Sequence, residues 1–242
     1  MKIIVCENYN EMSEKAACLI AEQITSKPTS VLGLATGSTP MGLYNFLVQM
    51  NEKQLVDFRE VKSFNLDEYY PIKPDNPQSY HYFMNENLFS KINIKPENIH
   101  ILDGTTANPS EECSRFEKLI EQSGGIDIQI LGIGENGHIG FNEPNENLNP
   151  KTHLTQLAES TIKANSRFFD NYDDVPKQAL TMGIGSILKA KKIILLASGS
   201  NKREIIYKLL KSDINTNLPA SLLKLHPNVI LIADKNAFPD QL

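Results

Sequence analysis

Short apolar runs rich in β-branched residues recur along the chain and are typical of buried strands. Amphipathic stretches of helical length separate several of them, for example residues 11–24 and 40–50. This alternation predicts right-handed crossovers and a mostly parallel sheet with helices on both faces, a Rossmann-like three-layer α/β sandwich. The predicted strands cover residues 2–5, 31–35, 61–65, 126–131, 192–197 and 229–233.

Length and composition predict a single catalytic domain over residues 1–242, because no segment resembles a linker or a repeat. A net charge of -5 gives no general attraction to nucleic acid or to an anionic membrane. The three cysteines lack disulfide or metal-ligand spacing, which predicts a reducing compartment and no metal. No apolar stretch approaches the roughly 18 residues of a membrane span, so we expect a cytoplasmic protein.

The segment after the second predicted strand favours an anion. Gly37, Ser38 and Thr39 precede Pro40, which is placed at the start of a helical pattern. Free backbone N–H groups and the helix dipole at such a start attract phosphate. A plain strand-to-helix turn fits this motif equally well, and a nucleotide P-loop is excluded because no Gly-Lys-Ser/Thr follows.

Adjacent carboxylates, Asp67 and Glu68, follow the third predicted strand. Because side chains of consecutive residues point in different directions, one carboxylate can face a ligand while hydrogen bonds hold the other. We predict that Asp67 is the base that removes a proton from a carbon next to a carbonyl, provided that burial raises its pKa. Taken alone, the pair would also suit a solvated acidic turn.

The most informative segment, GIGENGHIGFNEP, follows the strand at 126–131. Its glycines keep side chains away from a ligand, and His138 among them suits proton transfer between two oxygens. Glu143 is placed to orient the imidazole and to stabilise its charged form. The spacing of Gly132, Gly134 and Gly137 imitates a dinucleotide fingerprint, but no amphipathic helix or acidic partner follows, so we reject a nucleotide site.

Two basic residues complete the predicted site. Arg167 lies in NSRFFD, and Lys202 follows the strand at 192–197. Either could bind phosphate oxygens, Arg167 through its planar guanidinium and Lys202 as a point charge. Each would otherwise be an ordinary surface charge.

Six segments together resemble the glucosamine-6-phosphate deaminase (isomerase) family. The resemblance covers essentially the whole chain and is specific because all six motifs stand in the same order and at the same separations. It implies that the substrate phosphate rests on residues 37–39, Arg167 and Lys202. The segments are LATGSTPMGLY, FNLDEYY, GIGENGHIGFNEP, NSRFFD, ALTMGIGSIL and ASGSNKRE.

The resemblance implies a reversible, cofactor-independent reaction of amino-sugar (N-acetylglucosamine) catabolism, from glucosamine 6-phosphate and water to fructose 6-phosphate and ammonia. His138 would open the pyranose ring with the help of Asn136 and Glu143. Asp67 would then carry a proton between C2 and C1 through an enolamine, after which water replaces the amine. These implied roles agree with the chemistry of each residue type.

Two departures from the family pattern matter. Members often have aspartate at the position of Asn136, and an amide cannot stabilise imidazolium by charge, so Glu143 must do more of that work. Members activated by N-acetylglucosamine 6-phosphate have basic residues at the positions of His153 and Thr155 and extend further at the C-terminus. We therefore expect no such activation and a monomer or small homo-oligomer rather than a hexamer. A shift of the substrate saturation curve on adding the effector would contradict this expectation.

Two alternatives remain at this point. A 6-phosphogluconolactonase resembles this family in fold and also has a glycine-flanked histidine, but it would release acid and never ammonia. A sugar-phosphate sensor domain of a transcription regulator would bind without turnover. Such regulators carry a DNA-binding segment ahead of the domain, whereas the first predicted strand here starts at Lys2, so we expect no sensor and no nucleic-acid partner.

Overall fold

A seven-stranded, entirely parallel sheet forms the centre of the computed structural model, which describes residues 1–166, 169 and 171–240. It confirms the predicted fold class and contains all six predicted strands, with ends shifted by at most two residues. In spatial order the strands are β1 (Lys2–Cys6), β10 (Val229–Asp234), β9 (Lys192–Ala197), β6 (Ile128–Leu131), β2 (Val31–Leu34), β3 (Lys62–Asn65) and β5 (Ile99–His100).

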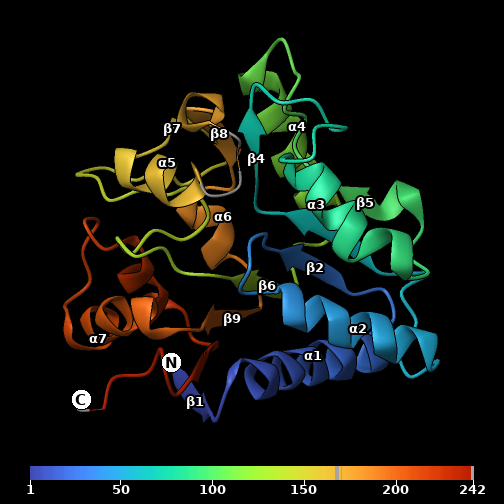
Figure 1. The fold of residues 1–242 in the computed structure, drawn as a ribbon. Coiled ribbons are helices and arrows are strands. Elements are labelled where there is room, and N and C mark those ends of the chain that lie inside the picture. The colour runs from blue at the N-terminus through green and yellow to red at the C-terminus, as the bar shows by residue number, and fades with distance from the viewer. Residues whose placement is uncertain (167–168, 170, 241–242) are drawn as a thin grey trace.

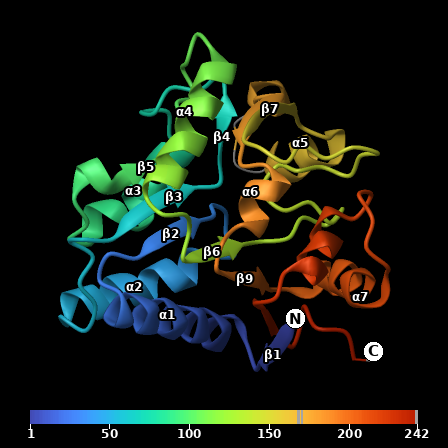
Figure 2. The ribbon, with the colours of Figure 1, turned by 180° about the vertical axis from the view of Figure 1, so that it is seen from behind.

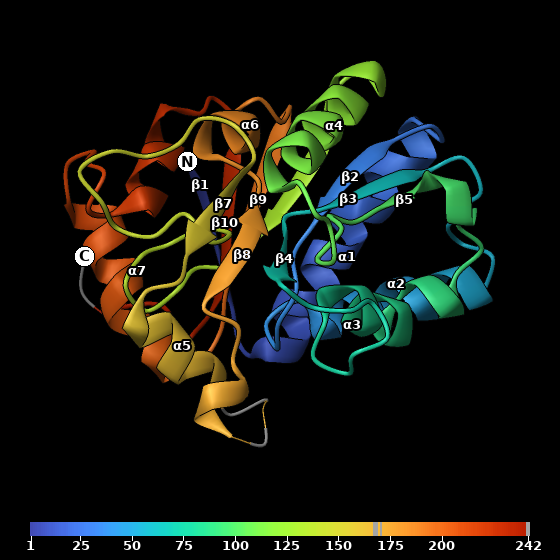
Figure 3. The ribbon, with the colours of Figure 1, turned by 90° about the horizontal axis from the view of Figure 1, so that it is seen from above.

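Helices cover both faces of this sheet; Figure 3 shows α4 on one face and α1 and α2 on the other. The α1 helix buries Ala16, Ala17 and Ile20, the apolar stripe expected of a helix packed on a sheet. On the opposite face, Phe116 of α4 meets Phe64 of β3 edge to face, with ring centroids 5.5 Å apart. The helices are α1 (Tyr9–Ser26), α2 (Met41–Glu52), α3 (Tyr80–Asn87), α4 (Pro109–Gln122), α5 (Glu159–Asn165), α6 (Ile184–Leu188) and α7 (Arg203–Lys211).

A second, antiparallel sheet was not predicted. It consists of β4 (Asp67–Tyr70), β8 (Gln178–Thr181) and β7 (His153–Gln156). The chain passes from one sheet to the other at Leu66, whose N–H donates to Leu34 of β2 and whose carbonyl accepts from Met182. Figures 1 and 2 show from opposite sides that this sheet and α5 form a separate layer in the upper part of the picture. The chain therefore leaves the main sheet immediately before Asp67.

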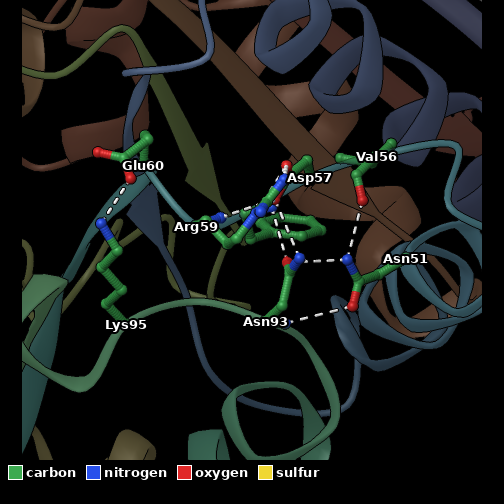
Figure 4. A network of polar contacts seen from close by, with 8 residues as sticks. Asn51, Val56, Asp57, Arg59, Glu60, Asn93 and Lys95 are labelled. Carbon is green, nitrogen blue, oxygen red and sulfur yellow. Dashed lines mark hydrogen bonds and ion pairs between the residues drawn. The ribbon is translucent and has the colours of Figure 1, made fainter.

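A network of polar side chains fixes the connection between α2 and β3 (Figure 4). Asn93 accepts hydrogen bonds from the side chain of Asn51 at 2.9 Å and from the Phe58 N–H at 2.8 Å, and it donates to Asp57 at 2.9 Å. The Asp57 carboxylate also pairs with Arg59. These contacts join the end of α2 to the segment that leads into β5.

Within the described part of the chain, no helix is long and apolar enough to cross a membrane.

Candidate active site

A cavity of about 750 Å³ lies where the chain leaves β2, β3, β6 and β9. Ligands in open parallel sheets gather at these carboxyl ends of the strands. The α5 helix, the start of α3 and Phe141 form the remaining wall. The predicted site residues that line the cavity are Gly37, Ser38, Thr39, Asp67, Asn136, His138 and Lys202.

The carboxyl groups of Asp67 and Glu68 face different surroundings, although both residues are buried and are neighbours in sequence. Glu68 is buried, and its carboxylate accepts hydrogen bonds from the N–H groups of Tyr69, Tyr80 and His81 at 2.8–2.9 Å. Burial raises the pKa of Glu68 to about 7, although these donors favour its ionised form. Glu68 thereby satisfies two free N–H groups in the first turn of α3; the sequence predicted that hydrogen bonds hold one of the two carboxylates, but not which groups donate them.

The Asp67 carboxyl faces the cavity instead. It is only 6 % exposed, and burial, followed by the neighbouring charge of Glu68, raises its pKa to about 8. Its Oδ2 lies 3.7 Å from the position that a Cβ on Gly140 would occupy, so the glycine-rich loop passes close to this carboxyl. The burial that the sequence argument required of a carbon base is therefore present.

His138 is held by a carboxylate on the side of its Nδ1 atom. Glu143 Oε2 lies 3.2 Å from His138 Nδ1, and the Thr161 hydroxyl donates to Glu143 Oε1 at 2.5 Å. Asn136 bridges the same group, because its Nδ2 donates to Glu143 at 2.7 Å while its Oδ1 accepts from the His138 N–H at 3.1 Å. Burial opposes ionisation, but His138 and these hydrogen bonds lower the pKa of Glu143 to about 2. Glu143 is therefore an anion at working pH.

Two glycines make room for the imidazole and the base. A Cβ on Gly134 would overlap the ring of His138. Gly140 has a φ of 56°, in the left-handed region that favours glycine, and it lies between Thr181 and Asp67. These close approaches explain why a glycine-rich segment surrounds the histidine.

The predicted phosphate turn is part of the cavity wall. Gly37 has a φ of 97°, and Ser38 and Thr39 follow it at the cavity wall. The α2 helix begins at Met41 with Pro40 as its capping residue, one position later than the sequence indicated. The hydroxyl of Tyr9, which sequence reasoning missed, donates to the Ser38 carbonyl at 2.9 Å and accepts from the Gly42 N–H at 2.7 Å.

Of the two predicted basic residues, Lys202 lines the cavity at the end of a short 3-10 turn, Ser200–Lys202. Arg167 lies outside the described residues, and its place in the site stays a prediction. Among the described residues, no group of three or more His, Cys, Asp or Glu side chains could hold a metal ion.

The sequence profile of one family, described as "Glucosamine-6-phosphate isomerases/6-phosphogluconolactonase", matches residues 7–231 of the chain. The chain belongs to this family. Relatives within it include the glucosamine-6-phosphate deaminases of Thermoanaerobacter pseudethanolicus, 55% identical over 100% of this chain and 96% of that protein, and of Halothermothrix orenii, 56% identical over 98% of both.

Two solved structures share the fold of this chain. A structure described as a monomeric glucosamine-6-phosphate deaminase superimposes with a TM-score of 0.96 at 45% identity, covering 98% of both chains. The 6-phosphogluconolactonase of Thermotoga maritima has a TM-score of 0.74 at 21% identity, covering 96% of this chain and 98% of that one. The second likeness shows the shared fold alone.

Sequence reasoning missed the aromatic part of the site. Tyr69, Tyr80 and Phe141 pack against one another at centroid distances of 4.8–6.0 Å, and Phe169 meets Tyr69 edge to face. All four line the cavity. The motif FNLDEYY contained the signal, because an aromatic residue two positions after a site residue on a strand points to the same side as that residue.

Proposed function

We propose that this chain is a glucosamine-6-phosphate deaminase that converts glucosamine 6-phosphate and water to fructose 6-phosphate and ammonia, without a cofactor, in amino-sugar catabolism. The observation that carries the proposal is that a buried carboxyl, Asp67, and a carboxylate-supported imidazole, His138, line one cavity from separate strand ends. Deaminase relatives at 55% identity over the full chain support the same reaction.

Ring opening is assigned to His138. The imidazole accepts the proton of the anomeric hydroxyl and returns one to the ring oxygen, so its charge rises and falls within one turnover. Glu143, ionised and 3.2 Å from Nδ1, stabilises the imidazolium that forms in between. Asn136 and Thr161 hold Glu143 through its two oxygens.

Proton transfer along the carbon skeleton is assigned to Asp67. Its carboxylate removes the proton from C2 of the open-chain sugar while O1 gains the proton that the substrate ammonium loses, which forms an enolamine, and the carboxylate then returns the C2 proton to C1. The product is a ketose imine; water adds at C2 and ammonia leaves. A raised pKa makes Asp67 a stronger base, and the ammonium group of the substrate beside it favours the ionised form needed for attack.

The phosphate is assigned to residues 37–39, Lys202 and Arg167. The first four are cavity residues, and the free N–H groups of the turn before α2 suit a dianion. Anchoring the phosphate at this end leaves C1 and C2 of an extended hexose for the end that holds Asp67 and His138.

The deciding experiment incubates the purified protein with glucosamine 6-phosphate and measures ammonia and fructose 6-phosphate together. Equal amounts of both are expected, and the absence of both would refute the proposal. Acid release from 6-phosphogluconolactone, measured in parallel, tests the lactonase alternative.

Asp67→Asn tests the assignment of the base. The variant keeps the shape of the side chain but cannot take a proton, so turnover should vanish while substrate binding by calorimetry stays within a few-fold of wild type. Lost binding would instead give Asp67 a structural role.

We further propose that the protein is a monomer or small homo-oligomer without activation by N-acetylglucosamine 6-phosphate. The structural relative at 45% identity is described as monomeric. Light scattering at assay concentration tests this, and a hexamer would contradict it.

A further inference from the structure

Asp234, the last residue of β10, is a buried carboxylate that the mechanism above does not use. It is 2 % exposed, and hydrogen bonds reach it from the Ser198 hydroxyl at 2.5 Å and from the Ala237 N–H at 2.8 Å. The Gly199 N–H is shared between both of its oxygens at 3.2 Å each. Asp234 itself is not part of the cavity wall, whereas Ser198 is.

The contact with Gly199 reaches Lys202 through the backbone. Gly199 has a φ of 90°, and its carbonyl accepts the N–H of Lys202 at 3.0 Å, which closes the turn Ser200–Lys202. Asp234 holds the N–H of Gly199, and the carbonyl of Gly199 holds the N–H of Lys202. The position of Asp234 therefore affects the position of the turn Ser200–Lys202. Ser198, Asn201 and Lys202 of this loop all line the cavity.

The same loop is joined to the segment that carries His138. The side chain of Asn201 donates to Glu135 at 2.6 Å, and Glu135 lies three residues before His138 at the cavity wall. The loop 198–202 is therefore held from behind by Asp234 and from the side by Glu135. Of these two supports, only Asp234 is buried.

We propose that Asp234 is a positioning residue for the phosphate end of the site, acting through Gly199 on Ser198 and Lys202; this rests on the proposed function. A carboxylate suits the place because two of the described groups that face it are backbone N–H groups, which can only donate, and one of them, Gly199 N–H, lies 3.2 Å from both oxygens. An amide would place its NH₂ group beside the Gly199 N–H in either orientation and so weaken the hold on the loop.

Asp234→Asn should weaken phosphate binding and leave the chemistry intact. We expect KM for glucosamine 6-phosphate to rise about tenfold, the size of one lost charge-assisted hydrogen bond, with kcat within about twofold of wild type. Calorimetry should show a loss of about tenfold in affinity for fructose 6-phosphate, and inorganic phosphate should inhibit more weakly. Asp234→Ala should have a larger effect of the same kind; if it does not fold, Asp234→Asn still answers the question.

Asp240→Asn is the matched control, because Asp240 is exposed and pairs only with Arg203 among the described residues. A folded Asp234→Asn protein with unchanged KM and phosphate affinity would overturn the inference, and so would a fall in kcat at unchanged KM. Because fructose 6-phosphate binding is measured without turnover, a wild type that binds it but releases no ammonia refutes the proposed function and leaves this inference testable.

Discussion

Asp67 and Glu68 are adjacent carboxyl groups with different roles, because different groups surround them. Three backbone N–H groups surround Glu68, whereas no hydrogen bond from the described residues reaches the Asp67 carboxyl. A carboxyl left without protein donors in a cavity is available to a substrate. Burial without such donors is also what raises its pKa most.

The pH dependence of kcat/KM should report this carboxyl. Because the pKa of Asp67 is raised to about 8, most of the free enzyme carries a proton there at pH 6.5 and cannot act as the base. We expect log kcat/KM to rise with a slope near 1 up to about pH 8 and then to level off. Rates from pH 5.5 to 9.5, corrected for the separately titrated substrate amine, test this. A flat profile between pH 6 and 8 would contradict it.

Asn136→Asp should add a second ionisation to that profile. The amide fits because it donates to Glu143 and accepts from the backbone of His138 at the same time. A carboxylate at the same 2.7 Å contact would have to share a proton with Glu143, so one pKa of the pair would rise far above about 2.

With one proton shared, the pair carries the same single negative charge as Glu143 in wild type, and it gains a second negative charge only above the raised pKa. We therefore expect the slope of log kcat/KM below pH 7 to stay near 1, and kcat/KM above the raised pKa to exceed the wild-type value because the doubly charged pair stabilises imidazolium more strongly. The control, Asn147→Asp, adds the same charge on the exposed loop that precedes β7. A profile of Asn136→Asp identical to that of wild type up to pH 9.5 would show that the charge of this pair does not limit the rate.

At the scale of elements, six of the seven strands of the main sheet were predictable, whereas β5 and the antiparallel sheet were not. Five of the six apolar runs became strands that are largely buried, which a parallel strand covered on both faces requires of its sequence, whereas β1 is an edge strand with Ile3 and Val5 exposed. The strand β4 begins with two carboxylates, which are poor strand formers, and it pairs with residues more than 100 positions away, as in Asp67 with Thr181. Local sequence contains no signal for such a pairing.

The site residues were predictable where they lie close to a predicted strand. Asp67, His138 and Lys202 could be located because each comes shortly after a predicted strand of the main sheet. Thr161 could not, since it lies on the short helix α5 and meets Glu143 only through the tertiary fold. The chemical roles of these residues stay predictions that the variants above test.

The first residue of α1 supports the phosphate turn at the start of α2, and Tyr9→Phe should show how much. Its hydroxyl links the Ser38 carbonyl to the Gly42 N–H, so the variant leaves both groups unpaired. We expect the free energy of unfolding to fall by about 1 kcal/mol and KM to rise three- to tenfold with kcat unchanged. Urea denaturation and steady-state kinetics measure the two effects. Tyr207→Phe, which changes an exposed tyrosine on α7, should change neither.

At the scale of the whole molecule, the two ends of the parallel strands have different roles. The carboxyl ends lie at the cavity, whereas networks of side chains cover the amino ends, including the network around Asn93 in Figure 4. One of these groups, Asp127, is a buried carboxylate immediately before β6. It accepts from Lys27 at 2.7 Å, from Lys191 at 2.9 Å and from the Val31 N–H at 2.8 Å. One carboxylate thus joins the end of α1 to the starts of β2, β6 and β9.

Asp127→Asn should separate stability from catalysis. Burial opposes ionisation of Asp127, but hydrogen bonds from both lysines and from Val31 lower its pKa. A lowered carboxyl pKa contributes stability that is complete above the unfolded value of about 4 and is lost as the pH falls through the folded value. We expect the variant to lose about 2 kcal/mol at pH 7, at the low end for a buried carboxylate because the lysines are partly exposed and their attraction is screened.

The difference from wild type should shrink as the pH falls below about 4, because the unfolded chain takes up a proton there before the folded carboxylate does, and kcat at 25 °C should not change. Urea denaturation from pH 3 to 8 with parallel assays measures this, and Asp213→Asn on the exposed surface is the control. A variant as stable as wild type at pH 7 would show that the lysines do not offset the cost of burying this charge. A variant with normal stability but reduced kcat would show that the contacts of Asp127 at the amino ends of the strands affect the catalytic groups.

Asp67→Asn should behave in the opposite way, with no turnover and no loss of stability at pH 7, since the carboxyl it replaces is costly to ionise in the fold.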